Sequence, residues 1–188
     1  MNNNNLIAAV LIILAALVLI YYPSFGKNNE LTGSATEIQV GSSALIANYF
    51  AIAASNALTT DGIKWSILNP GDIDVNADGN NQAGTSNYFI TVSSDSNVNV
   101  DLCIKASAPL TSGLNTIPLA NSKWDSDTAN PLLTNAIAID LVYAGADTNI
   151  VPSNSDYYRF WLSVPGSQAA GTYTNTISFK GVQTGNVC

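Results

Sequence analysis

The amino-acid sequence predicts an all-β fold, an antiparallel two-sheet β-sandwich preceded by an N-terminal hydrophobic helix. The first observation is that apolar side chains recur at every second position in residues 157–164 and 172–180. The second is the turn chemistry between these runs, with Pro165-Gly166 and Gly171. The third is the long connection 107–135, rich in Pro, Ser, Asn and Thr, where a two-sheet fold would cross between sheets. The strand order is open between immunoglobulin-like and jelly-roll.

The chain begins with a hydrophobic segment. Residues 6–20 form an unbroken apolar run, and a helix from Leu6 through Ile20 to Tyr22 would be about 25 Å long. That is slightly short for a hydrocarbon core of about 30 Å, but workable with tyrosines at the interface. Residues 24–26, Ser-Phe-Gly, also offer a small-x-small cleavage site, so the run fits a signal peptide as well. We favour an anchor, and under either interpretation most of the protein is exported.

The anchor segment has a further interpretation, the assembly helix of a type IV pilin. The glycine-terminated processing site and the acidic residue five positions beyond it are both absent, so this interpretation is the weakest of the three. We therefore predict a signal or anchor helix over residues 1–26, a flexible tether over 27–35, and one β-sandwich domain over 36–188.

Residues 36–40 follow the tether and read Thr-Glu-Ile-Gln-Val, with Ile38 and Val40 in one phase of a strand. As the default, they form the first strand of their own domain, because strands usually pair near their sequence neighbours. The alternative is an exchanged strand that completes a neighbouring subunit by β-strand addition.

Further along the chain, the predicted elements are strands and turns. Residues 44–58 are ambiguous between helix and strand, and we favour strand. Residues 63–68 alternate as a strand and end in an Asn-Pro-Gly turn. Residues 88–92 and 98–106 are predicted to be strands of one hairpin, joined by a turn at 95–97.

The C-terminal half is predicted to hold a long connection followed by three strands. The connection 107–135 is interpreted as irregular, with Trp124 as an aromatic that pins it to the domain. Residues 136–143 are predicted to form a strand, and the runs 157–164 and 172–180 a second hairpin.

The charge balance excludes several classes of function. There are 13 carboxylates against 6 Lys and Arg, for a formal charge of −7, so no basic stripe is available for nucleic acid. The absence of histidine removes Ser-His-Asp and Cys-His catalysis and His-ligated zinc. Only 10% of residues are charged, so polar surface must come from Ser, Thr, Asn and Gln, with little charge repulsion against self-association. We expect no enzyme.

The chain has two cysteines, Cys103 in an apolar strand run and Cys188 at the last position. One interpretation is a disulfide that ties the C-terminus to the domain and implies an oxidising compartment. The other is a pair of unrelated thiols. Given the export signal, we favour the disulfide.

One loop has the pattern of a calcium site. Asp74, Asn76 and Asp78 occupy positions 1, 3 and 5 of a calcium loop, and Gly79 occupies position 6. Position 12 is Thr85, where an EF-hand has a bidentate Glu. Asp, Asn and Gly are also ordinary turn residues, and we favour a solvated loop without metal. Calcium, if bound, would be structural, and no cofactor is required.

Two other groups have the residue types of a binding or catalytic site. Asp125 and Asp127 follow Trp124, and a carboxylate pair beside an aromatic would suit a glycosidase, but carboxylates two apart in such a loop are more often solubilising. The other group alternates outward along one strand and would either form a binding patch or brace the sheet; it consists of Tyr157, Arg159 and Trp161.

The C-terminal motifs resemble those of a known class of protein. The last two strand-like runs resemble the closing strands of immunoglobulin-like β-sandwich modules of microbial cell surfaces. The resemblance lies in Val164-Pro165, residues 170–173 (Ala-Gly-Thr-Tyr), Ile177 and Phe179. The Gly-Thr-Tyr step resembles the tyrosine at a strand corner of such sandwiches. The layout also resembles exported archaeal proteins and, more distantly, the jelly-roll subunits of donor-strand filaments. The resemblance covers most of residues 62–188 and implies a fold and a compartment.

These observations lead to one expected function and one alternative. We expect an extracellular structural subunit of a cell-surface assembly, a pilus-like filament or a surface layer, that pairs with copies of itself through β-edges or through the apolar helix. The alternative is a monomeric membrane-anchored adhesin or binding module, with binding residues in its long loops. An uncleaved helix would add the membrane as a partner, and nucleic acid is not expected.

Overall fold

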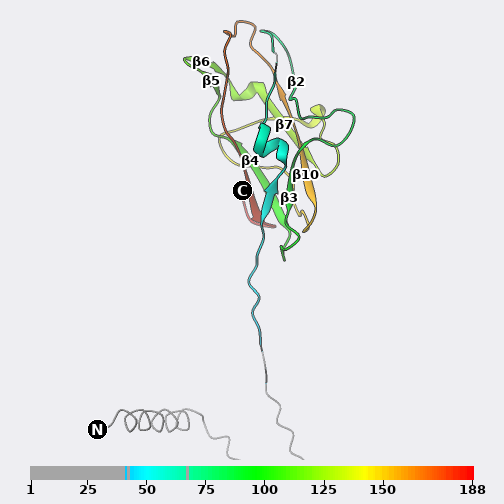
Figure 1. Ribbon diagram of the computed structural model, residues 1–188. Helices are drawn as coiled ribbons and strands as arrows, with labels where there is room; N and C mark the ends of the chain where they lie inside the picture. Colours follow the sequence, from blue (N-terminus) through cyan, green and yellow to red (C-terminus); the bar gives the residue numbers. More distant parts are fainter. Residues whose placement is uncertain (1–40, 42, 67) are drawn as a thin grey trace, which may run out of the picture. The chain divides into compact units, whose positions relative to one another are not determined.

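The computed structural model describes residues 41, 43–66 and 68–188. The predicted helix over 1–26, the tether over 27–35 and the candidate exchanged strand over 36–40 lie outside these residues. Residues Leu45–Cys188 form one compact unit that is mostly β, with antiparallel pairing throughout (Figure 1). Its strands are β1 (Ile52–Ala54), β2 (Val75–Asn76), β3 (Tyr88–Val92), β4 (Val100–Ala106), β5 (Leu110–Ser112), β6 (Asn115–Ile117), β7 (Ser122–Asp127), β8 (Ile137–Ala138), β9 (Ala144–Gly145), β10 (Ser155–Leu162) and β11 (Ile177–Gln183). The short helical turns are η1 (Ala57–Asp61), η2 (Leu119–Asn121) and η3 (Leu133–Asn135).

Strand β10 is the centre of the larger sheet. This sheet has six strands in the order β1-β3-β10-β7-β8, with β2 also paired to β10. The N-terminal half of β10 pairs with β3, from Ser155 opposite Thr91, and its last two residues pair with β2, where Trp161 lies opposite Asn76. Its other side pairs with β7 over most of its length. Two separate strands therefore share one side of β10.

The smaller sheet has three strands in the order β11-β4-β9, and a separate two-stranded sheet joins β5 and β6. β11 and β4 pair along seven residues each, from Ile177 opposite Ala106 to Gln183 opposite Val100. β9 is short, but the chain that follows it continues along β4 and bridges Ile150 to Val100. β4 is therefore paired on both sides, and β11 forms an edge of the sheet.

The hydrophobic core lies between the six-stranded and three-stranded sheets. Buried aromatic and β-branched residues from both sheets form one cluster, which includes fully buried Tyr158 of β10 and Val100 of β4. The ring of Tyr158 meets the ring of Phe179 on β11 edge-on, with centroids 5.0 Å apart. Burial of such side chains is worth about 1.5–3 kcal/mol each, so this cluster supplies most of the stability.

The alternation of β10 is confirmed, but its second phase is also buried. Tyr158, Phe160 and Leu162 share the face toward the core. Arg159 and Trp161 on the other face are only 5% and 3% exposed. The prediction that they belong to an outward stripe is therefore wrong, because other segments of the chain cover this face of the sheet.

Both predicted hairpins are wrong. β10 belongs to the six-stranded sheet and β11 to the three-stranded sheet, and residues 163–176 connect the two. In the same way, β3 and β4 belong to different sheets. Alternation and turn residues identify strands locally, but they do not distinguish a hairpin from a connection that crosses between two sheets.

Four further predictions need correction. Residues 107–135, expected to be irregular, contain the β5–β6 hairpin and β7, which carries Trp124. Residues 63–66 and 68 form no strand, although Ile63 and Trp65 are half-buried against the core. Only Ile137–Ala138 of the predicted strand 136–143 pairs, with β7. In the ambiguous stretch 44–58, only β1 is a strand and η1 begins at Ala57.

The predicted disulfide is confirmed. Cys103 of β4 is bonded to Cys188, with Cα atoms 5.8 Å apart, and the described chain has no free cysteine. The bond closes a loop with a sequence separation of 85, for which chain entropy predicts a stabilisation of roughly 4–5 kcal/mol. Within the described residues, no helix is long and apolar enough to cross a membrane.

Candidate functional site

Asp74, the first residue of the calcium-loop pattern, is engaged by a lysine. Its carboxylate lies 2.9 Å from the ammonium of Lys123 on β7 and accepts a hydrogen bond from the Ser163 hydroxyl at 3.0 Å. The hydrogen bond from Lys123 lowers the pKa of Asp74 below its usual value. Asp74 also has a positive φ of 49°, so the chain turns sharply here before β2.

The other two residues of that pattern have partners of their own. The Asn76 side-chain oxygen accepts a hydrogen bond from the Asn80 amide at 3.1 Å, and Asp78 accepts from both the backbone N–H and the hydroxyl of Ser66. In the part of the chain that the structure describes, no three His, Cys, Asp or Glu side chains gather as a metal site would require. The preferred metal-free loop and the alternative calcium site both stay predictions.

The loop after β2 completes the larger sheet. Asn80 is buried, and its side-chain amide donates to the carbonyl oxygen of Phe160 at 2.6 Å while its oxygen accepts from the Phe160 N–H at 2.9 Å. A neighbouring strand would make bonds of this kind with Phe160, whose carbonyl oxygen also accepts from the Ala77 N–H at 3.0 Å. The side chain thus fills the position on β10 between the residues paired to β3 and those paired to β2.

Gly79 lets this loop approach the sheet. A Cβ at this position would lie 2.4 Å from the ring of Tyr88, which is far inside contact distance. The Gly79 N–H donates to the Tyr88 hydroxyl at 3.1 Å. Its role in the structure is therefore close packing on an aromatic ring.

Arg159, the only arginine, holds two loops against β10. Its guanidinium donates to the carbonyl oxygens of Asn80 at 2.9 Å, Asn81 at 2.8 Å, Gly84 at 2.6 Å and Pro131 at 2.9 Å. Desolvation lowers the pKa of Arg159. All these partners are backbone carbonyls, so this side chain is a structural anchor and not part of a surface binding patch.

The carboxylates beside Trp124 hold the turn after β7. Asp125 accepts a hydrogen bond from the Leu132 N–H at 2.6 Å, and Asp127 accepts from the Ala129 N–H at 2.8 Å. Burial raises the pKa of Asp125 above its usual value. Each carboxylate thus stabilises a loop next to its own strand.

Tyr173 bonds to its own connecting segment. Its hydroxyl donates to the carbonyl oxygen of Ala169 at 2.8 Å and accepts from the Gln168 amide at 2.6 Å. Tyr173 lies in no strand, and the resemblance to a tyrosine at a strand corner stays a prediction. The two bonds of the Tyr173 hydroxyl fix the shape of residues 168–173, which form one wall of the cleft described below.

The outer edge of β11 is open. Every second residue of β11 and its ends directs its backbone groups toward β4 and the residues that flank β4. These residues are Thr176, Ser178, Lys180, Val182 and Thr184. Ile177, Phe179 and Gly181 direct theirs to the other side, where no described residue bonds to them. An open edge of this kind is a template for another strand.

A cleft of about 680 Å³ lies beyond the Ile177 end of this edge. Its walls are residues 63–66, 68 and 70 on one side and 168–175 on the other, and its floor is apolar. The floor side chains are Leu110, Ile117, Leu162 and Val164. Trp65 and Tyr173 pack against this floor from opposite walls. The volume is in the range of known ligand pockets.

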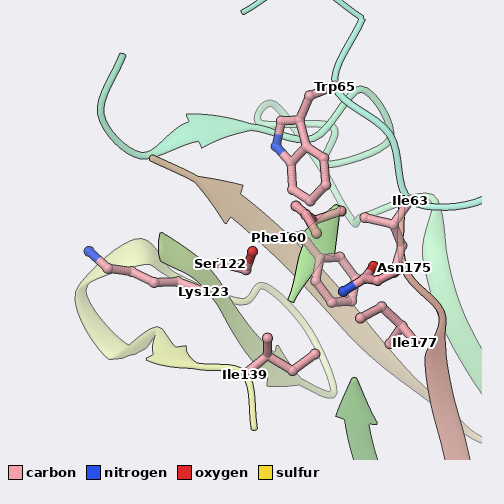
Figure 2. Close-up of a pocket in the computed structure, with 9 residues that line it drawn as sticks. Ile63, Trp65, Ser122, Lys123, Ile139, Phe160, Asn175 and Ile177 are labelled. Atoms are coloured by element: carbon pink, nitrogen blue, oxygen red, sulfur yellow. The ribbon is translucent and has the colours of Figure 1, made fainter. Parts of the chain in front are cut away.

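The cleft continues toward β11. A smaller cavity of about 30 Å³ shares Ile63, Trp65 and Asn175 with the cleft and is also lined by Ile177 at the start of β11. Figure 2 shows Ile63 beside Asn175 and Ile177, above Phe160 of the larger sheet. The start of β11 therefore adjoins the cleft, and we refer to the cleft and the open edge together as the groove.

The sequence reasoning missed this groove. It identified residues 36–40 as a candidate exchanged strand but named no acceptor for it. Edge strands are usually protected by proline or several charges, and β11 has no proline and one charged residue, Lys180. That signal is visible in the sequence only once β11 is known to be an edge.

Comparison with protein-family models, curated proteins and solved structures finds no match to this chain.

Proposed function

We propose that this protein is a non-enzymatic structural subunit that assembles with copies of itself into an extracellular polymer, a pilus-like filament or a surface layer. The observation that carries the proposal is the open edge of β11, where the backbone groups of Ile177, Phe179 and Gly181 have no partner among the described residues. An added strand would pair with all of them and remove an edge that otherwise favours uncontrolled aggregation.

Residues 36–40 of a neighbouring copy are the strand that we propose for this edge. In an antiparallel register, Ile38 lies opposite Phe179 and Val40 opposite Ile177, so the apolar phase faces the groove. The polar phase faces out, and Glu37 then lies opposite Lys180. A pair of opposite charges directly across two strands is favourable by about 0.2–1 kcal/mol. A parallel register would place Gln39 nearer to Lys180 and lose this pair.

The compartment and the fold support an exported subunit. The disulfide between Cys103 and Cys188 persists in an oxidising environment, which fits export by the apolar run 6–20. The core between two antiparallel sheets is consistent with a β-sandwich of immunoglobulin-like or jelly-roll order. Retention of the apolar helix would add a second means of assembly or of attachment to the membrane.

The cleft favours a second candidate, a monomeric membrane-anchored adhesin or binding module. Its volume of about 680 Å³ would suit a small molecule or a short peptide. On this alternative, the protein would remain dispersed and would leave the membrane only with detergent.

Electron microscopy of the full chain and of five variants tests the proposal. We expect filaments or lattices from the wild type and none after deletion of residues 27–40. Glu37→Lys and Lys180→Glu should each weaken assembly by like-charge repulsion, and their combination should restore it. As a control, Lys105→Glu, which changes a lysine on the paired strand β4, should not rescue Glu37→Lys. Assembly that persists unchanged after the deletion would contradict strand addition, and dispersed wild-type monomers would favour the binding module.

A further inference from the structure

The first residues of the folded unit carry an exposed apolar pair. Leu45 is 99% exposed and Ile46 is 80% exposed. Exposed leucines and isoleucines are common singly, but two adjacent ones that cover nothing in their own domain indicate a contact with another molecule. The floor of the cleft is an apolar surface of complementary character.

We propose that the cleft receives Leu45 and Ile46 of the next copy in the polymer. This inference rests on the proposed strand addition at β11. Residues 168–175 form no strand, so reach and not register places the pair. With Val40 opposite Ile177, the five or six residues to Leu45 and Ile46 extend up to about 20 Å beyond that point, over the cleft that residues 168–175 line.

The same chain cannot fill its own cleft in this way. The Asn48 amide donates to the Gln183 side chain at 3.0 Å, which holds Asn48 at the far end of β11. From Gln183 to Ile177 the strand covers about 20 Å at about 3.3 Å per residue, and the cleft lies beyond Ile177. Leu45 is three residues from Asn48 and can reach about 11 Å.

The described stretch that contains Leu45 and precedes β1 lies at the end of the unit opposite to the β5–β6 hairpin (Figure 1), and Leu110 and Ile117 of that hairpin line the cleft. The donor segment and the acceptor cleft are therefore at opposite ends of one copy. Such an interface is heterologous, and it repeats head to tail.

A photo-crosslinking amino acid in place of Leu45 tests this contact in assembled full-length protein. Mixing isotope-labelled and unlabelled copies before assembly identifies crosslinks between chains by mass spectrometry. We expect interchain crosslinks from position 45 to residues 63–70 or 168–175. Polymer in which position 45 crosslinks only within its own chain, or to other surfaces, would overturn this inference and leave strand addition intact. Absence of polymer from the unsubstituted protein would instead overturn the proposed function.

A pair of variants provides an independent measurement. The double substitution Leu45→Ser and Ile46→Ser should raise the critical concentration for assembly by about tenfold to a hundredfold, because burial of these side chains is lost. The domain should remain folded, since neither side chain is covered in the isolated subunit. Ile137→Ser is the control, because Ile137 is also an exposed apolar residue but lies on β8, an edge strand of the larger sheet. This substitution should leave the critical concentration unchanged. Equal effects of the two changes would contradict a specific contact.

Discussion

At the scale of single residues, the charged and polar groups of this protein are used to join loops to strands. Arg159 bonds only to carbonyl oxygens, so its positive charge is stabilised by dipoles and not by a carboxylate. Asn80 replaces a missing strand partner beside Phe160. Asn80 bonds to a residue 80 positions away, and Arg159 bonds to residues 28 to 79 positions away, so losing either side chain would leave buried backbone groups unpaired.

Arg159→Lys is expected to destabilise the fold strongly. Lysine keeps the charge, but a single ammonium cannot satisfy carbonyl groups that the planar guanidinium reaches from different directions. We expect a loss of about 2–4 kcal/mol in the free energy of unfolding, measured by denaturant titration. Lys105→Arg, on the outward side of β4, is the control and should change stability by less than about 0.5 kcal/mol. A small effect of Arg159→Lys would mean that the loops do not depend on the guanidinium.

Asp156 is a buried carboxyl group with no hydrogen-bond partner among the described residues, and the neighbouring Tyr158 hydroxyl also lacks one. Burial raises the pKa of Asp156 to about 7, and the nearby carboxylates of Asp147 and Asp127 add to the rise. The folded protein therefore holds this proton more tightly than the unfolded chain, where the pKa of an aspartate is about 3.9. The stabilisation is fully present below about pH 4 and is lost as the pH rises to about 7.

Asp156→Asn should remove this pH dependence. The three-unit difference in pKa corresponds to about 4 kcal/mol, so wild-type stability should fall by up to that amount between pH 4 and pH 8. The neutral amide should flatten the profile and raise stability at pH 8. Denaturant unfolding at both pH values measures the change, with Asp95→Asn in an exposed turn as the control. A wild-type profile without this fall would show that Asp156 is solvated or paired in solution.

At the scale of elements, β10 and β11 differ in how completely they are paired with other strands. β10 is buried on both faces and paired along both sides, with β3, Asn80 and β2 in sequence along one of them. β11 has one paired side and one open side. A central strand of this kind contributes to stability, whereas an unpaired edge is available for association.

The connection between these two strands is also informative. Residues 163–176 leave the larger sheet, form the wall of the cleft at 168–175 and enter the smaller sheet as β11. The Tyr173 hydroxyl fixes this wall through its bond to Ala169. This segment thus supplies one wall of the cleft and leads directly into β11, which is why the cleft adjoins the start of the open edge.

At the scale of the whole molecule, the proposed donor residues Leu45 and Ile46 and the proposed acceptor cleft lie at opposite ends of the compact unit Leu45–Cys188. A heterologous contact of this kind leaves one unused donor and one unused acceptor on every assembly that does not close into a ring. The low charge content, 10% of residues, adds little repulsion between copies. Linear growth is the expected outcome.

The variant that lacks residues 27–40 should therefore act as a chain terminator. It retains the β11 edge as an acceptor but has no strand to donate. Added in sub-stoichiometric amount to assembling wild-type protein, it should shorten the filaments, measured as their length distribution in micrographs. The same variant with Lys180→Glu as well should shorten them less, because its acceptor edge is also impaired. Unchanged filament length with both proteins would contradict polar growth through β11.

The sequence by itself determined the properties that depend on neighbouring residues. Alternation identified β3, β4 and β10, and the two cysteines with an export segment predicted the bond between Cys103 and Cys188. The all-β class followed from the same local patterns. These predictions succeeded because side-chain direction in a strand has a period of two, whatever the strand later pairs with.

Only the tertiary structure decided which strands pair and which side chains are covered. The alternation of β10 and β11 is the same whether they form one hairpin or belong to two sheets. Arg159 and Trp161 have the spacing of an outward phase, yet distant loops bury them. The cleft is lined by separate parts of the chain, which include residues 63–66 with 68 and 70, β5, β6 and residues 168–175. No single stretch of the sequence therefore predicts it. Pairing and burial depend on contacts between residues far apart in the chain, and a local pattern holds no information about which of these contacts form.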